Sequence, residues 1–161
     1  MSNLSPTQHQ LFNAVQKHDH STVSRILNDN PSLNINCIDT SGWTPWMYAT
    51  KNGDHHTLQA FFDHRLCASD LNSFKTMINT QHGQGLTPLM IAVSSGKEEA
   101  VLLLLKNGAD INATTPRCET ALMFAAQKSL PNIVKALLKA GASPSILDTV
   151  NIKTGVVIQY S

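Results

Sequence analysis

The chain has 161 residues, of which 42% are apolar and only 14% are charged, and its formal net charge is +1. It holds no block of Lys and Arg, so the composition argues against a nucleic-acid or acidic-membrane surface. No apolar run approaches the roughly 18 residues of a membrane span, and the N-terminus lacks a signal-peptide pattern. We therefore expect a cytoplasmic protein without membrane insertion. Cys37, Cys67 and Cys118 are odd in number and irregularly spaced, which predicts neither a disulfide framework nor a zinc site.

The first segment, residues 5–38, predicts two helices with a weak apolar pattern between Leu11 and Leu27. Its first helix carries polar residues such as Gln10 and Gln16 on one face. A terminal unit of a stacked array needs such a soluble side, so this segment is predicted to be an N-terminal cap.

The second segment, residues 39–81, begins a helix at Thr44-Pro45 and is longer than its successor. The step from Thr44 to Thr87 is 43 residues, whereas the step from Thr87 to Thr120 is 33. The difference places an insertion at residues 66–75, where apolar spacing and a cap at Ser69 or Asp70 favour a short helix. It is either a binding loop or, as we favour, an extended outer helix or a plug on the convex side. In the latter case Phe74 packs against Phe61 or Phe62.

The third segment, residues 82–114, has the clearest pattern. Thr87 is suited to cap a helix and Pro88 to occupy its first position. A second helix follows, with Glu98 and Glu99 in its first turn, where they favour the macrodipole. Its run of Val and Leu at residues 101–105 is apolar on nearly every face, which predicts a helix packed between neighbouring units.

The fourth segment, residues 115–147, repeats this pattern with two changes. Cys118 stands where the other segments have a turn glycine, and Ala121 stands where they have proline. Residues 148–161 begin a fifth unit and then become strand-like in composition. They form either a terminal cap or the start of a continuation that the chain lacks.

The third segment closely resembles an ankyrin repeat. The resemblance is carried by Gly85, Thr87-Pro88-Leu89, Ala92, Gly96, Leu104-Leu105 and the run from Gly108 to Ala113. It implies one all-α domain over residues 1–161, a solenoid of stacked helix-turn-helix units with turn or hairpin tips. The units are 5–38, 39–81, 82–114, 115–147 and a partial fifth at 148–161. The family's histidine is replaced by Met47, Met90 and Met123, which we interpret as core filling, with a methionine-lined groove as the alternative.

The resemblance also implies a non-catalytic adaptor or scaffold, monomeric and without cofactors, that binds a protein partner. In the family, partners contact the concave face and the turn tips. Trp43 is the expected anchor, because Trp and Arg are frequent interface hot spots, and Leu86 would extend an apolar ridge that Glu119 interrupts. Carried over position by position, the expected contact residues are Thr40, Ser41, Trp43, Lys51, Asn52, Gln84, Leu86, Ser94, Ser95, Arg117, Glu119, Gln127 and Lys128.

Other chemistry receives little support from the sequence. Seven histidines are present, and the pairs His18–His20 and His55–His56 fall at equivalent turns, where adjacent units would bring them close. No Cys or carboxylate is fixed beside them by spacing, so we expect solvated helix-start histidines and no metal. No catalytic motif occurs. The alternative function is a recognition or regulatory domain of a larger protein, for instance a secreted microbial effector enzyme acting in a host cytoplasm, whose chemistry lies elsewhere.

Overall fold

The computed structural model describes residues 4–64 and 71–143, and this part of the chain is built from α-helices joined by turns and loops. The sole β-type pairing within it is an isolated antiparallel bridge between His82 and Leu86. The predicted all-α stack is confirmed. The helices are α1 (Pro6–Gln16), α2 (His20–Asp29), α3 (Pro45–Asn52), α4 (His55–Asp63), α6 (Leu71–Asn79), α7 (Pro88–Ser94), α8 (Glu98–Lys106), α9 (Ala121–Gln127) and α10 (Pro131–Lys139).

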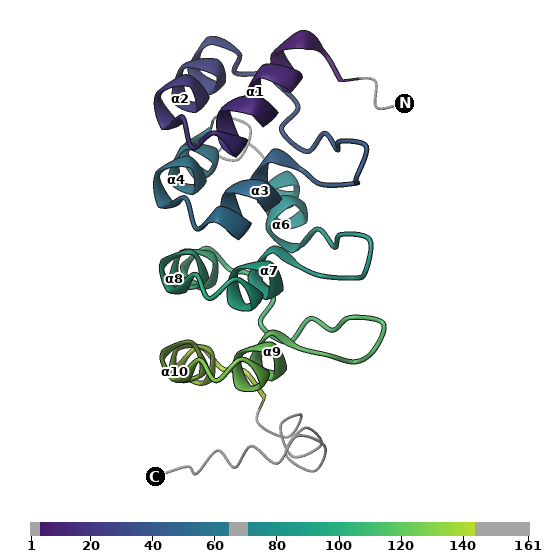
Figure 1. The fold of residues 1–161 in the computed structure, drawn as a ribbon, viewed down its shortest axis with the longest axis vertical. Coiled ribbons are helices and arrows are strands. Elements are labelled where there is room, and N and C mark those ends of the chain that lie inside the picture. Colours follow the sequence, from purple (N-terminus) through teal and green to yellow (C-terminus); the bar gives the residue numbers. More distant parts are fainter. Residues whose placement is uncertain (1–3, 65–70, 144–161) are drawn as a thin grey trace.

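The helices form two layers along the long axis of the molecule. Helices α1, α3, α7 and α9 form an inner layer, α2, α4, α8 and α10 form an outer layer, and the tips project from the inner layer (Figure 1). Each inner helix contacts its own outer helix and the next inner helix along the stack. Inner helices and tips together line the concave face. The exact boundaries of the repeats remain a prediction.

The inner helices begin where the sequence predicts, because a threonine hydroxyl satisfies a backbone N–H that the helix leaves unpaired. Thr44, Thr87 and Thr120 each accept a hydrogen bond from the N–H three residues later, at 3.2, 3.3 and 3.3 Å. Each cap stabilises its helix by about 1 kcal/mol. Pro45 and Pro88 occupy the first helical position, where the missing N–H has no partner to lose.

Left-handed residues recur at three places in the units, one of which follows the outer helices α8 and α10 at Gly108 and Gly141. A second follows each inner helix, at His18, Gly53, Gly96 and Ser129, and a third sits in each of the later tips, at Gly42, Gly85 and Cys118. Cys118 has a φ of 59° and therefore occupies the backbone conformation of the glycine it replaces. Its place in the fold is structural, as the sequence indicated.

The core confirms the interpretation of two of the three methionines. Met47 and Met90 are each 1% exposed and fill the stack interior, so they line no surface groove. Met123 is half-buried, and its sulfur accepts a hydrogen bond from the Thr120 N–H at 3.3 Å. One expectation for α8 is wrong: Leu102 is 49% exposed, because each outer helix keeps a solvent-facing side.

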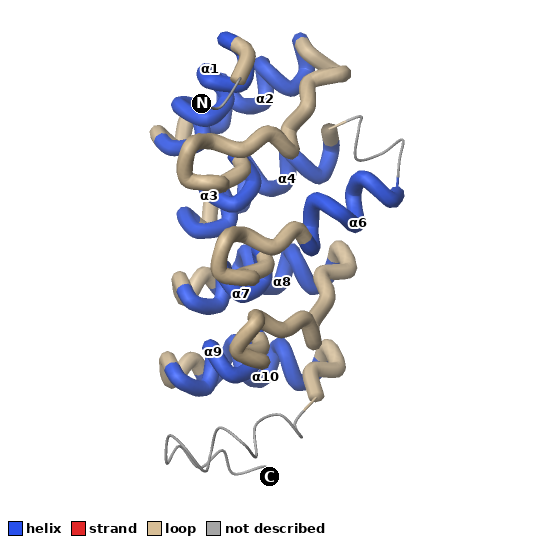
Figure 2. Tube along the Cα trace, turned by 90° about the vertical axis from the view of Figure 1, so that its right-hand side faces the viewer, coloured by secondary structure: helices blue, strands red, loops and turns tan. Residues whose placement is uncertain are grey.

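Helix α6 is the departure from a regular stack. Helix α4 ends at Asp63 and His64 is extended, so the insertion does not lengthen the outer helix. Instead α6 is a separate helix that lies on the right of the side view (Figure 2) and contacts α7, with Met77 and Ile78 buried. The predicted cap at Ser69 or Asp70, the packing of Phe74 and the segment after residue 143 lie outside the described residues.

Candidate functional site

The tip of the second unit is held rigidly by Asp39. Its Oδ1 accepts hydrogen bonds from the Ser41 N–H at 2.8 Å and the Trp43 N–H at 2.9 Å, and its own N–H donates to the Trp43 carbonyl at 2.9 Å. Gly42 supplies the left-handed residue that closes the turn, with a φ of 76°. The backbone on which Trp43 sits is therefore held in place by hydrogen bonds within its own tip.

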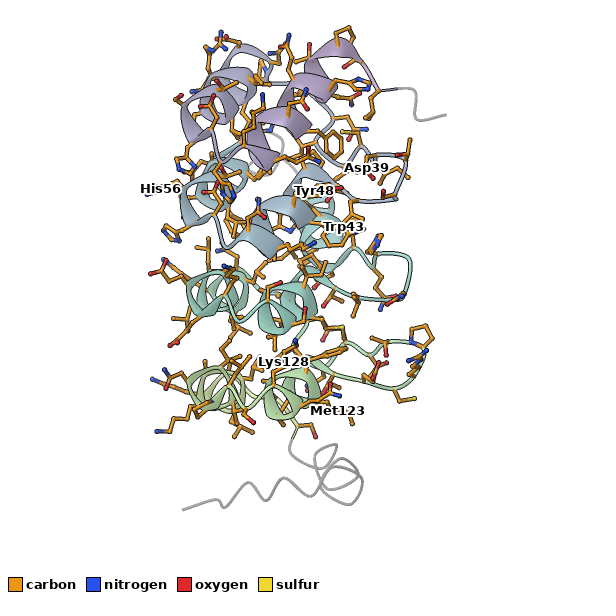
Figure 3. The ribbon with its side chains drawn as sticks, viewed as in Figure 1. Asp39, Trp43, Tyr48, His56, Met123 and Lys128 are labelled. Carbon is orange, nitrogen blue, oxygen red and sulfur yellow. The ribbon has the colours of Figure 1, made fainter. Side chains whose placement is uncertain are left out.

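The Trp43 ring is half-buried and lies among side chains from three parts of the chain. Its centroid is 5.2 Å from the neighbouring Tyr48 ring (Figure 3). The His82 ring lies 4.8 Å from it and the Lys51 Nζ 5.4 Å from it. Tyr48 and Lys51 come from α3, whereas His82 comes from the next tip. We call Asp39, Trp43, Tyr48, Lys51 and His82 the aromatic tip cluster. A cation above an exposed indole contributes about 0.5–1 kcal/mol.

Hydrogen bonds connect the cluster to its surroundings. The Tyr48 hydroxyl donates to the Asp39 Oδ2 at 2.7 Å, and the His82 Nδ1 lies 3.1 Å from the Gly42 carbonyl oxygen. Phe12 of α1 meets the Tyr48 ring edge-on at 6.1 Å. The cluster therefore ties the first inner helix, the second unit and the third tip together.

The electrostatics of the cluster favour an ionised Asp39. Burial opposes the charged form, but hydrogen bonds from the Trp43 N–H, the Tyr48 hydroxyl and the Ser41 N–H outweigh it and lower the pKa of this carboxyl. Burial and the Asp39 carboxylate together raise the pKa of Tyr48, which stays a neutral donor. Asp39 and Tyr48 therefore form a stable hydrogen-bonded pair, and neither group is held in a reactive protonation state.

The sequence-predicted residues fall into two groups. The Lys51 ammonium lies over the Trp43 ring, so these two residues are in direct contact. Trp43 is half-buried, and Leu86 is half-buried against the core, so both are less exposed than the other predicted tip residues such as Thr40 and Gln84. Ser94, Ser95, Asn52 and Glu119 are half-buried as well. The remainder of the predicted set is exposed on the inner helices and tips, namely Thr40, Ser41, Gln84, Arg117, Gln127 and Lys128.

Sequence reasoning missed three members of the aromatic tip cluster. Asp39 opens the tip as an Asp-Thr-Ser-Gly turn, a pattern whose side chain commonly bonds the backbone two residues on, so that signal was available. Tyr48 follows Thr44 by four residues, which is one helical turn. No sequence signal reports His82, because its contact with Trp43 depends on how successive tips stack.

The histidines do come together at the turns, as predicted. His20 and His56 have ring centroids 5.4 Å apart. The expectation that no carboxylate lies near them is wrong: Asp54 is buried, and the His20 Nδ1 lies 3.0 Å from its carboxylate. Thr57 also donates to Asp54, from its N–H at 3.0 Å and its hydroxyl at 2.7 Å. Asp54 is thus the cap of α4, and its carboxylate makes three polar contacts with two residues, His20 and Thr57.

An open groove of about 830 Å³ runs between α2 and α4, on the outer side of the stack. Histidine, serine and short apolar side chains line it, among them His56, Ser24 and Leu27. His64 also lines the groove, but its ring nitrogens are buried and have no hydrogen-bond partner. Within residues 4–64 and 71–143, no three His, Cys, Asp or Glu side chains gather closely enough to hold a metal ion. None of the described helices has the length and apolar character needed to cross a bilayer.

Comparison with known proteins places this geometry in a family. The model of "Ankyrin repeats (3 copies)" matches residues 11–115 and again residues 75–148. The B-cell lymphoma 3 protein homolog of Mus musculus is 34% identical over 107 residues, which cover 66% of this chain and 22% of that protein.

Two further relatives cover more of the chain. The "Ankyrin repeat, SAM and basic leucine zipper domain-containing protein 1" of Dasypus novemcinctus is 29% identical over 152 residues, 88% of this chain and 29% of that protein. The "Probable E3 ubiquitin-protein ligase XBOS31" of Oryza sativa subsp. japonica is 30% identical over 136 residues, 84% and 28% respectively. The chain therefore spans less than a third of the length of these curated relatives. With the threonine-capped helix pairs, their two layers and the matched residues in agreement, the chain belongs to the ankyrin-repeat family.

Proposed function

We propose that this chain is a non-catalytic adaptor module that binds a protein partner on its concave face, with the aromatic tip cluster as the anchor. Ankyrin repeats are in general protein–protein interaction modules, and the family match supports that role. The observation that carries the proposal is Trp43 itself: a large, half-buried ring on a fixed backbone, flanked by Tyr48, His82 and Lys51.

Binding costs conformational entropy for each side chain that it immobilises. A side chain that is already held in place loses little conformational freedom when a partner arrives, so more of the contact energy becomes affinity. Trp43 has this property because its backbone N–H is bound by Asp39 and its ring contacts two other rings. Tryptophan is also enriched among residues that dominate binding energy. The contact would extend over the exposed residues of neighbouring units, including Gln84, Arg117 and Lys128.

The alternative is a recognition or regulatory domain of a longer protein, such as a secreted effector enzyme with its chemistry elsewhere. The short share of each relative that the chain covers favours this reading, and one relative is named a probable E3 ubiquitin-protein ligase. In either case we propose that the protein is a monomer and acts in the cytoplasm. If it is a secreted effector, that cytoplasm is the one of the host cell.

The test compares two surface variants on opposite faces. Trp43→Ala removes the proposed anchor, and Leu102→Ala removes an exposed apolar side chain from the outer layer. Each protein, and the unmodified chain, is immobilised and used to capture partners from a cell lysate, with quantification by mass spectrometry. We expect Trp43→Ala to lose specific partners that Leu102→Ala retains.

Thermal melting, measured by circular dichroism, separates binding from folding. Because the Trp43 ring contacts Tyr48 and His82, its removal lowers the melting temperature slightly. Tyr48→Phe serves as a second control, since it removes only the hydroxyl bonded to Asp39 and keeps the Trp43 ring and its aromatic neighbours. If Trp43→Ala captures the same proteins as the unmodified chain, the concave-face proposal is wrong.

A further inference from the structure

The inner helices of three units end in an exposed lysine on or beside the concave face. Lys17 directly follows α1, Lys51 lies in the last turn of α3 and Lys128 directly follows α9. The equivalent positions of α7 hold Ser94 and Ser95. Because α1, α3, α7 and α9 contact one another in that order, the three lysines form a row along the stack with one gap. We call Lys17, Lys51 and Lys128 the lysine row.

The charges of the lysine row are not neutralised within the described part of the chain. The ion pairs found there involve His18 and His20 with Asp54, and no lysine lies within 4.0 Å of a carboxylate. Glu119, the acidic residue nearest in register to Lys128, accepts a hydrogen bond from the Thr115 hydroxyl at 3.1 Å. Its carboxylate is thus engaged locally.

The carboxylates of the concave face are few, since most acidic side chains lie elsewhere. Asp39 accepts hydrogen bonds from two N–H groups of its own tip and from the Tyr48 hydroxyl of α3. Exposed acidic residues are concentrated on the outer helices, at Asp29, Asp63, Glu98 and Glu99. The outer helices also carry four exposed basic residues, which balance these acidic ones: Arg25, Lys106, Lys135 and Lys139. Among the described residues the concave face carries Lys17, Lys51, Arg117 and Lys128 against Asp39 and Glu119, so the face that holds Trp43 is the more positive side of a chain whose net charge is only +1.

From this arrangement we infer that the partner presents an acidic, extended segment that runs along the stack, with its carboxylates on the lysine row and an apolar side chain against Trp43. This inference rests on the proposed function and specifies the chemistry of its partner. Charge complementarity across an interface fixes register and accelerates association, whereas the buried aromatic contact supplies affinity.

The geometry predicts a spacing for the acidic residues. Packed helices lie about 8–10 Å apart, and an extended chain advances about 3.3–3.6 Å per residue, so one unit corresponds to about three residues. Carboxylates that face Lys17 and Lys51 are then about three residues apart. The carboxylate for Lys128, two units further on, lies about six residues beyond.

A nucleic acid fits this row less well. Along a DNA duplex each strand carries one phosphate per about 3.4 Å of helix axis, so lysines about 8–20 Å apart would leave most phosphates unpaired. A role confined to helix stability also accounts for a lysine at a helix end, because a cation there interacts favourably with the macrodipole. The outer helices α8 and α10 end in lysines as well, at Lys106 and Lys139, which provides a matched control.

The experiment selects peptides of about 12 residues from a random displayed library on the unmodified chain, long enough to cover the row. Enriched peptides are synthesised with a fluorescent label and their affinities measured by anisotropy. Two triple variants are compared, Lys17→Gln/Lys51→Gln/Lys128→Gln on the concave face and Lys106→Gln/Lys135→Gln/Lys139→Gln on the outer layer. Trp43→Ala and a single-stranded oligonucleotide of the same charge complete the set.

We expect enriched peptides to be acidic, with carboxylates spaced as above. Their affinity should fall about tenfold or more in the concave triple variant and change less than about twofold in the outer one. It should also fall by about tenfold between about 50 and 500 mM NaCl. Neutral or basic peptides that depend on Trp43 would overturn this inference and leave the proposed function standing. Peptides that bind Trp43→Ala equally well would overturn both, and tighter binding of the oligonucleotide would overturn the acidic-peptide assignment.

Discussion

Replacing Gly85 by alanine tests how closely successive tips pack. Gly85 has a φ of 78°, and a Cβ built there would lie 2.4 Å from the Pro116 Cδ and 3.4 Å from the Thr115 Cα. Carbon atoms prefer separations of about 3.5–4.0 Å, so the tip of the fourth unit must move. Pro116 Cδ belongs to a ring closed on the backbone and cannot rotate away as the end of a flexible side chain would.

Two contributions set the loss of stability expected in Gly85→Ala. The left-handed conformation costs an alanine about 1–2 kcal/mol relative to glycine, and forced overpacking adds about 1–3 kcal/mol. Gly85→Ala should therefore lower the free energy of unfolding by about 2–5 kcal/mol in total. Gly42 is the matched control, because its φ is 76° and an added Cβ would meet only His82, at 3.7 Å. Gly42→Ala should cost about 1–2 kcal/mol.

The assay is urea unfolding followed by tryptophan fluorescence, with thermal melting by circular dichroism alongside. In a chain of this length, 1 kcal/mol corresponds to about 2–4 °C in melting temperature. A double variant, Gly85→Ala/Pro116→Ala, should recover most of the difference between the two single glycine variants, since it removes the ring. Equal destabilisation by Gly85→Ala and Gly42→Ala, within about 0.5 kcal/mol, would refute the tip contact.

Three further outcomes follow from local structure. Cys118→Gly should raise the free energy of unfolding by about 0.5–1 kcal/mol, because Cys118 has a φ of 59°, whereas Cys118→Ala should give no gain. Hydrogen bonds from the Thr22 hydroxyl and N–H, and from Ser21, hold the pKa of Asp19 at about 2. Its contribution to stability is present above the unfolded pKa of about 3.9 and is lost as the pH falls towards 2, so Asp19→Asn should be less sensitive to acid in this window. Leu104→Ala should cost about 2–5 kcal/mol and Leu102→Ala less than about 0.5, because only Leu104 is buried.

Each of these has a contrary result. Equal gains from Cys118→Gly and Cys118→Ala would show that the thiol, and not the backbone conformation, is unfavourable. Parallel stability curves for Asp19→Asn and the unmodified chain between about pH 4 and pH 2 would contradict the capping role. Similar losses in the two leucine variants would mean that α8 has no solvent-facing side.

The starts of the inner helices α3, α7 and α9 were predictable, because each depends on neighbours in the sequence. A threonine hydroxyl that bonds an N–H three residues later is a local contact, and so is the left-handed turn at Cys118. The 33-residue step then transfers one unit's pattern to the next. These features set the fold class and the order of the units.

The pairing of His20 with Asp54 shows where local reasoning stops. These residues are 34 positions apart in the sequence, and they meet only because the corresponding turns of two successive units lie next to each other in the stack. The same holds for His82 beside Trp43, which joins two tips. Helix α6 was predictable as a helix, but its side of the stack depends on which surface remains uncovered. The exposure of Leu102 likewise depends on how far the next unit reaches over α8.

Successive tips are in direct contact with one another. His82 contacts Gly42 and Trp43 of the preceding tip, Gln81 donates to the Thr114 carbonyl at 3.2 Å, and Gly85 faces Pro116. We expect these contacts between tips to resist bending, because further bending of the stack towards its concave side would compress them. We therefore expect the tip contacts to limit the curvature of the molecule independently of helix packing. In the proposed complex the partner, and not the stack, would then supply most of the adjustment that binding requires.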